Sequence, residues 1–242
     1  MKLIIIRHGD PDYSIDSLTP TGWKEAELLS SRICKMDVKA FYCSPLGRAK
    51  DTAKPTLEKL GREATVMDWL REFPVEITNP DGGAADCAWD WLPAAWTAEP
   101  AFYDREKWMD VPIFAEANMR ESYKKVTDGL DALLASHGYR REGGYYRAEC
   151  PNEDTIVFFC HFGLECVLLS HLLGVSPMTL WHGTAAAPTS VTTLNTEERR
   201  RGFAYFRMSA FGDISHLYAA GAEPSFACRF CETYDNVDQR HD

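Results

Sequence analysis

The stretch that decides the fold is KLIIIRHG at residues 2–9. Its four consecutive aliphatic residues are apolar on both faces, which is typical of a central parallel strand covered on both sides by crossover helices. The strand then ends on Arg7, His8 and Gly9. Arginine offers a planar set of donors that matches phosphate oxygens, and glycine lets a ligand approach the backbone closely. Since ligands bind beyond the carboxyl ends of strands in open α/β sheets, we expect a binding site at this turn.

Two later apolar runs repeat the pattern of a strand followed by polar side chains. Residues 38–43 predict a strand that leads to Arg48, and residues 155–160 predict a strongly buried strand that leads to His161. The tail after residue 223 is expected to be irregular. The other predicted elements are helices over 20–36, 49–60, 119–136 and 164–173, strands over 65–67, 190–194 and 203–207, and a hairpin over 138–150.

Residues 73–118 interrupt this alternation. The segment holds Trp89, Trp91, Trp96 and Trp108 without a period of either two or 3.6 residues. Disordered chain is poor in aromatic residues, so the segment is interpreted as an inserted aromatic-rich cap. The cap is either a satellite core or the wall of a substrate pocket, and Trp89 and Trp91 are the candidates for that wall.

The length and the net charge of the chain limit its domain organisation and the kinds of partner that it is expected to bind. A chain of 242 residues without a linker-like run favours a single domain over 1–242, with a three-layer α/β/α architecture around a mostly parallel sheet. The net charge of -10 argues against nucleic acid or anionic membrane as a main partner. No signal peptide or long apolar run is found, so we expect a cytoplasmic protein, as a monomer or homodimer.

The eight cysteines are scattered through predicted core elements. Without an export signal they are expected to be reduced thiols. Cys228 and Cys231 have the spacing of half a zinc site, but no second pair accompanies them, and no metal is predicted.

The predicted strands that end at His8, Ser44 and His161 converge if they lie side by side in a parallel sheet. That edge then holds Arg7, Arg48 and the two histidines. Two guanidinium groups and two imidazoles around one cavity repel one another unless an anion neutralises them. A phosphoryl group is the economical anion.

This arrangement resembles the histidine phosphatase superfamily, which is also called the phosphoglycerate-mutase-like family. The motifs arrive in the family's order over roughly residues 1–72 and 119–220, and together they are highly specific. They are Arg7-His8-Gly9, Leu18-Thr19 with Gly22 and Ala26, Ser44-Pro45-Leu46-Gly47-Arg48-Ala49 with Thr52-Ala53, Leu70 with Glu72, and His161 after its hydrophobic strand.

The resemblance implies a role for each matching residue. His8 is the nucleophile that forms a phosphohistidine, which water then hydrolyses. Arg7, Arg48 and His161 hold the equatorial oxygens of the phosphoryl group. Glu72 is the general acid for the leaving alcohol and then the base for water. Positively charged side chains replace a metal ion, so no cofactor is expected.

Some positions depart from the family's pattern or stay open. Pro11 and Ser14 stand where many members have Ser or Thr and Asn, so Ser14 offers a hydroxyl in place of the usual groups. Phe162 replaces a glycine after the second histidine, where the backbone N–H is still able to face phosphate, as at Gly9. Glu76 is an alternative to Glu72 as the acid. His182 and His216 follow apolar segments and are candidates for the pocket lining.

The leading hypothesis is a metal-independent phosphomonoesterase of the histidine acid type that acts on a small phosphorylated metabolite. A phosphoglycerate-type mutase is the alternative within enzymes, and the changes at Pro11 and Ser14 argue mildly against it. A catalytically weak module that binds a phosphate ligand is the alternative from another class. A peptide-binding or protein phosphatase is the third alternative, and it depends on whether the cap contacts the substrate.

Overall fold

The apolar stretch near the N-terminus forms β1 (Lys2–Arg7), which is buried beyond its first residue. The computed structural model describes residues 1–81, 87–227 and 229–241. The other strands are β2 (Pro11–Asp12), β3 (Ser17–Leu18), β4 (Ala40–Cys43), β5 (Thr65–Val66), β6 (Tyr139–Glu142), β7 (Tyr145–Ala148), β8 (Thr155–Cys160), β9 (Val191–Arg200) and β10 (Phe203–Asp213).

The central sheet has the strand order β5-β4-β8-β1-β9-β10-β7-β6 within the described ranges. β5, β4, β8 and β1 run parallel, while β9, β10, β7 and β6 pair antiparallel. The predicted α/β fold is confirmed, and so is the expectation that the strands ending near His8, Ser44 and His161 are neighbours. Their carboxyl ends therefore meet at one edge of the sheet, and the antiparallel strands extend the sheet on the far side of β1.

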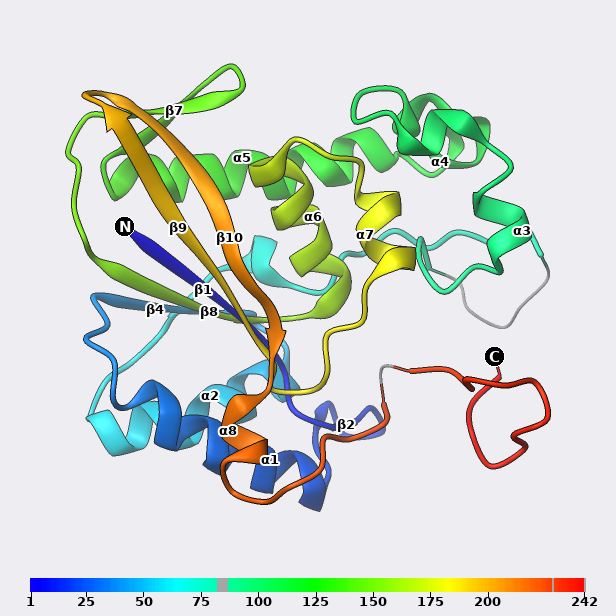
Figure 1. Cartoon of the computed structure of the whole chain (residues 1–242), viewed down its shortest axis with the longest axis horizontal. Helices are drawn as coiled ribbons and strands as arrows, with labels where there is room; N and C mark the ends of the chain where they lie inside the picture. Colours follow the sequence, from blue (N-terminus) through cyan, green and yellow to red (C-terminus); the bar gives the residue numbers. More distant parts are fainter. Residues whose placement is uncertain (82–86, 228, 242) are drawn as a thin grey trace.

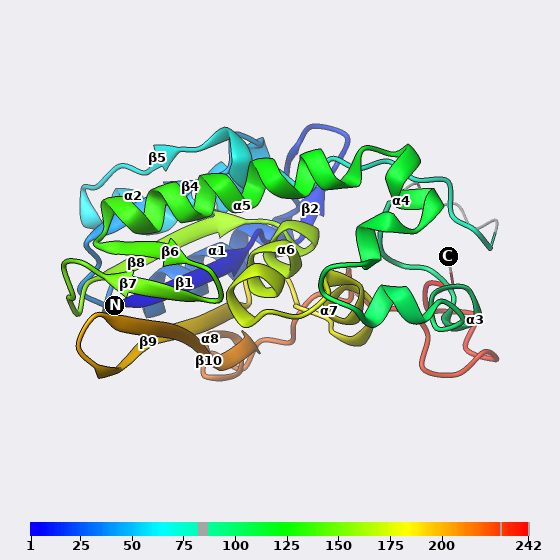
Figure 2. The ribbon, with the colours of Figure 1, turned by 90° about the horizontal axis from the view of Figure 1, so that it is seen from above.

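Helices cover both faces of the sheet (Figures 1 and 2), with α1, α2 and α8 on one face and α5 and α6 on the other. Thr19 caps the first of them, accepting a hydrogen bond from the backbone N–H of Gly22 at 3.1 Å, as its position before Pro20 predicts. The helices are α1 (Pro20–Ile33), α2 (Gly47–Leu60), α3 (Pro93–Trp96), α4 (Pro112–Glu116), α5 (Met119–Ser136), α6 (Phe162–Leu173), α7 (Pro177–Gly183) and α8 (Ser215–Tyr218).

The alternation of side chains along β1 divides the core into two layers. Ile4 and Ile6 pack with residues of α1 and α2, whereas Leu3 and Ile5 belong to the larger cluster that includes α5 and α6. This is why each of the residues 3–6 of the strand is aliphatic. No helix in the described ranges is long and apolar enough to cross a membrane.

The inserted segment forms α3, α4 and the short 3-10 turns Pro100–Tyr103 and Trp108–Asp110. Trp108 and Phe114 are fully buried and share one hydrophobic cluster with α5 and α6. The same segment also carries Trp89 and Trp91, which line a cavity described below. Part of the cap is thus a core, and part is a pocket wall.

The cysteines that the structure describes are free thiols, and among them only Cys150 is exposed. Cys228 lies outside the described residues, so the spacing between it and Cys231 has no structural account.

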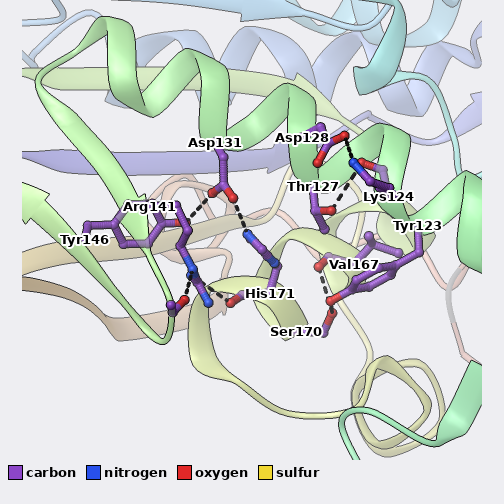
Figure 3. Close-up of polar contacts among 11 residues, drawn as sticks. Tyr123, Lys124, Thr127, Asp128, Asp131, Arg141, Tyr146, Val167, Ser170 and His171 are labelled. Atoms are coloured by element: carbon purple, nitrogen blue, oxygen red, sulfur yellow. Dashed lines mark hydrogen bonds and ion pairs between the residues drawn. The ribbon is translucent and has the colours of Figure 1, made fainter.

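A polar network joins α5, α6 and the β6–β7 hairpin (Figure 3). Asp131 in α5 accepts hydrogen bonds from the hydroxyl of Tyr146 at 2.7 Å and from Nε2 of His171 at 2.9 Å. Arg141 donates to the carbonyl oxygen of His171 at 3.3 Å, and its guanidinium lies 4.9 Å from the ring centre of Tyr146. Because α6 starts beside His161, this network fixes the direction of the helix that follows that histidine.

We expect Asp131→Ala to lower the free energy of unfolding by about 1–3 kcal/mol, because the buried Tyr146 hydroxyl then loses its acceptor. Asp128→Ala is the matched control, since it removes only an exposed ion pair with Lys124 on the same helix, worth about 0.3–0.5 kcal/mol. Denaturant unfolding of both variants measures the difference. Equal losses would show that the network adds nothing beyond a surface charge pair.

Candidate active site

Three neighbouring strands place the candidate site residues at one edge of the sheet. Arg7 is the last residue of β1, and the backbone N–H of His8 donates to Cys160 of β8 at 3.0 Å. His161 follows β8 directly, and the centres of the two histidine rings lie 5.2 Å apart. Arg48 stands in the first turn of α2, just after β4. The turns after the three strands thus bring four of the predicted residues together.

His8 is held as a neutral imidazole with one free nitrogen. Its side chain is 2% exposed, and its Nδ1 lies 2.8 Å from the carbonyl oxygen of Gly9. A carbonyl only accepts, so Nδ1 carries the proton and Nε2 keeps its lone pair. Burial, followed by the charge of Arg7, lowers the pKa of His8 to about 3. The ring therefore keeps a free lone pair on Nε2 across the neutral range of pH.

Each of the two arginines binds a protein acceptor through Nη1 and has other N–H donors that are available to a ligand. Nη1 of Arg7 donates to the carbonyl oxygen of Ala186 at 2.5 Å. Nη1 of Arg48 binds Asp16 at 2.7 Å, and the backbone N–H of Gly47 donates to the same carboxylate at 2.7 Å. Within the described ranges, Nε of each arginine is buried without a hydrogen-bond partner. An oxyanion in the site would satisfy these donors.

His161 is fully buried. Its Nε2 is 2.7 Å from the hydroxyl of Ser44, while its Nδ1 has no partner in the described part of the chain. Burial, followed by the charges of His8 and Arg48, holds the pKa of His161 well below its usual value. The ring therefore adds no charge to the free site.

Glu72 and Glu76, the two candidate acids, have different surroundings. Oε1 of Glu72 accepts hydrogen bonds from the backbone N–H groups of Phe73 at 2.8 Å and Leu164 at 2.9 Å. Burial raises the pKa of the Glu72 carboxyl, although these two bonds oppose the shift. Glu76 is exposed and does not line the cavity. The structure thus brings Glu72, and not Glu76, to the site.

A cavity of about 1000 Å³ opens in front of these residues. Most of the predicted site residues line it, and so do residues of the C-terminal tail, which the sequence did not indicate. The predicted residues in the lining are Arg7, His8, Arg48, Glu72, Trp89, Trp91, Phe162 and His182.

Four predicted residues are outside the lining: His161, which is fully buried, and Ser14, His216 and Gly9. The hydroxyl of Ser14 donates to Asp12 at 2.6 Å on an exposed loop, so the expectation that Ser14 binds phosphate is not met by its position. His216 in α8 is 3.1 Å from the hydroxyl of Thr189 and is also outside the lining. Gly9 uses its N–H to donate to Thr52 at 2.9 Å. Ser14 is thus bound to a neighbouring carboxylate, and His216 and Gly9 are each bound to a threonine hydroxyl.

Sequence reasoning missed three polar residues around the site. Asp16 pairs with Arg48, and Ser44 contacts His161. Glu165 in the first turn of α6 is 1% exposed, and burial raises the pKa of its carboxyl to about 7. Ser44 carried a signal because it directly follows a predicted strand. Asp16 and Glu165 carried no such signal. One is an acid in a loop and the other an acid in an apolar helix, and the neighbours of such residues are set only by the tertiary fold.

Comparisons with known proteins agree with this geometry. The model of the histidine phosphatase superfamily (branch 1) matches residues 3–208. Probable phosphatase C1687.21 of Schizosaccharomyces pombe is 36% identical over 233 residues, which cover 90% of this chain and 95% of that protein. A 2,3-bisphosphoglycerate-dependent phosphoglycerate mutase of Thermoplasma acidophilum is 31% identical over 84 residues, 30% of this chain and 42% of that protein.

The solved structures add the fold. A phosphoserine phosphatase mutant from Entamoeba histolytica in complex with phosphoserine aligns with a TM-score of 0.59 at 20% identity, covering 89% of this chain and 98% of that one. At this identity the structural similarity supports a shared architecture. The match of the family model over most of the sequence supports common descent. The chain belongs to the histidine phosphatase superfamily, branch 1.

Proposed function

We propose that this chain is a phosphomonoesterase of the histidine acid type, which hydrolyses a small phosphorylated metabolite through a phosphohistidine on His8. The observation that carries the proposal is the hydrogen bond between Nδ1 of His8 and the carbonyl oxygen of Gly9. It leaves Nε2 as the only free nitrogen of a buried imidazole beside Arg7 and Arg48. Membership of the superfamily supports the same chemistry.

In the first step, Nε2 of His8 attacks phosphorus and forms an N–P bond. The P–O bond to the leaving group breaks, and the leaving oxygen takes the proton of the Glu72 carboxyl group. Arg7, Arg48, His161 and the backbone N–H of Phe162 hold the other phosphoryl oxygens. These donors are fixed before the reaction, so they stabilise developing charge without reorganising.

In the second step, the Glu72 carboxylate takes a proton from water, and the resulting hydroxide attacks phosphorus. The N–P bond breaks, inorganic phosphate leaves, and Glu72 is protonated again. The raised pKa of Glu72 suits both steps, because the group has to give and take a proton in turn. The guanidinium groups supply the positive charge that a metal ion supplies in other phosphatases.

A phosphoglycerate-type mutase is the second candidate, and the partial match to the Thermoplasma acidophilum mutase favours it. A mutase has to return the phosphoryl group to an alcohol before water takes it. A module that binds phosphate ligands without turnover is disfavoured, because both histidines, both arginines and Glu72 stand together in one site. The cytoplasmic location and a monomeric or homodimeric state stay predictions.

We expect the protein to release phosphate from small phosphomonoesters in the presence of a chelator, and His8→Ala to abolish that release. Radiolabelled substrate should leave acid-labile phosphate on the wild-type chain and none on the variant. A variant that keeps half of the activity would exclude His8 as the nucleophile. Transfer of label to an added phosphoglycerate, instead of water, would favour the mutase.

Glu72→Gln should lower kcat by about 100- to 10,000-fold for a substrate with an alkyl leaving group, because that oxygen needs a proton. Glu76→Gln is the matched control, since the exposed Glu76 side chain lies one loop turn away, and it should retain nearly all activity. Steady-state kinetics on the two variants compare them. The reverse ranking would assign the acid to Glu76.

The pH profile of kcat/KM should fall on both sides of an optimum that lies between the pKa of His8 and the raised pKa of Glu72. As pH drops through about 3, His8 becomes protonated and stops being a nucleophile. As pH rises through the raised pKa of Glu72, the acid is lost. Glu72→Gln should remove the alkaline limb that belongs to this group, and any limb due to ionisation of the substrate should stay. An unchanged alkaline limb in the variant would contradict the assignment.

Gly163→Ala should lower kcat, because a Cβ atom built there lies 2.5 Å from the ring of Trp89 and 2.9 Å from Oε1 of Glu72. Either the ring or the acid then has to move. Gly183→Ala is the control, since Gly183 lines the same cavity and its added Cβ meets nothing within 4 Å. If both variants kept wild-type kcat, the position of Glu72 would not be critical.

A further inference from the structure

The cavity extends well beyond the phosphate end. Its volume of about 1000 Å³ is at the upper end of the range for sites that hold drug-sized ligands, and a phosphoryl group fills only a small part of it. The rest has to receive the leaving group. The cap supplies one part of this outer wall, through Trp89 and Trp91, and the C-terminal tail supplies another, through Phe230.

Trp89 sits beside the proposed general acid. A Cβ atom at Gly163 would touch both the six-membered ring of Trp89, at 2.5 Å, and Oε1 of Glu72, at 2.9 Å, so these two groups meet over the glycine. The ring is also packed against Trp181, with centres 5.9 Å apart, and Trp181 itself donates to the carbonyl oxygen of Gly163 at 2.9 Å. A flat apolar surface therefore borders the point where the leaving group departs.

Two described residues of the tail, Ser225 and Arg240, bind other parts of the domain. At one end, Ser225 donates its hydroxyl to Asp10 at 2.5 Å and its backbone N–H to Glu25 at 3.0 Å, next to the turn that holds His8. At the other end, Arg240 pairs with Asp90 of the cap at 3.2 Å. The tail passes from β2 towards α3 between these points (Figures 1 and 2).

Phe230 belongs to this tail, and its ring packs against Arg240. The guanidinium carbon of Arg240 lies 4.2 Å from the centre of its ring, so the same arginine holds both the ring and the cap. Phe230 is outside the hydrophobic clusters of the domain and is only half-buried. Phe230 is also one of the residues that line the cavity.

We propose that Trp89 and Phe230 form a leaving-group subsite, and that the enzyme acts on phosphomonoesters whose leaving group carries an aromatic ring. The inference rests on the proposed function for its catalytic part. A small polar leaving group would leave both aromatic surfaces facing water. A planar ring replaces that water and gains stacking contacts, while Arg7 and Arg48 hold the phosphoryl group at the inner end.

The acidic groups of the outer cavity are engaged in part. Asp90 pairs with Arg240, and Oδ2 of Asp81 accepts from the backbone N–H of Leu92 at 2.6 Å. Oδ1 of Asp81 is buried and has no hydrogen-bond partner in the described part of the chain. The charged residue Arg229 also lines the cavity, so the aromatic surface is one of several features that contact the leaving group.

The test compares the binding of benzylphosphonate and ethylphosphonate, two inert analogues, by calorimetry on the full chain. We expect benzylphosphonate to bind at least about 10-fold more tightly, because its ring is buried against the subsite. Trp89→Leu should reduce this ratio by about 3- to 10-fold, since leucine keeps apolar contact and loses the flat ring. Phe230→Leu should reduce it in the same direction.

Trp96→Leu is the matched control, because Trp96 belongs to the same cap and is outside the cavity lining, and it should leave the ratio unchanged. Binding of inorganic phosphate reports that each variant is folded. If Trp89→Leu does not fold, Phe230→Leu decides, since that ring is not in the core. Equal affinities of the two phosphonates, or a ratio untouched by both subsite variants, would overturn the subsite.

Hydrolysis of benzyl phosphate and ethyl phosphate, measured in parallel, separates the two proposals. A preference for benzyl phosphate in kcat/KM supports both. Preferential binding of benzylphosphonate without hydrolysis of either ester would refute the proposed function and keep the subsite. Equal kcat/KM for both esters would refute the subsite and keep the phosphatase.

Discussion

The site depends on the parallel pairing of β1 with β8. Their register places Arg7 level with Cys160, and the next backbone N–H, that of His8, donates across to β8. The residues that follow each strand, His8 and His161, therefore leave the sheet together, with ring centres 5.2 Å apart. A slip of one residue in this ladder would send one ring to the opposite face of the sheet. The backbone hydrogen bonds thus set the distance between the proposed nucleophile and its neighbouring donor.

Close backbone packing keeps the loop after β1 in place. A Cβ atom at Gly9 would lie 2.9 Å from the carbonyl oxygen of Gly22, and one at Gly22 would lie 2.3 Å from that of Asp10. Only glycine allows the loop and the start of α1 to approach so closely. The same loop is bound to the tail through Ser225, so the phosphate end and the outer wall of the cavity share one support.

Electrostatics then make the preformed site receptive to an anion. Burial keeps both histidines neutral, so the positive charge of the inner site comes from Arg7 and Arg48, and Asp16 balances part of it. Glu72 is surrounded by protein and by the ring of Trp89, which favours its protonated form. A neutral imidazole, fixed cations and a carboxyl group with a raised pKa are the features on which the proposed phosphoryl transfer to His8 depends.

The sequence by itself determined the buried strands β1, β4 and β8, the helix start at Thr19 and the residues that follow these strands, because these are local patterns of apolar runs, caps and turns. It predicted β9 and β10 too short, over 190–194 and 203–207. It also determined the family, since the motifs keep their order. Only the tertiary structure separated Glu72 from Glu76, moved Ser14 and His216 out of the cavity, and brought Phe230 into it. The cap and tail have no periodic pattern, so their positions follow from long-range contacts, such as Trp89 over Gly163 and Arg240 with Asp90, that no local signal encodes.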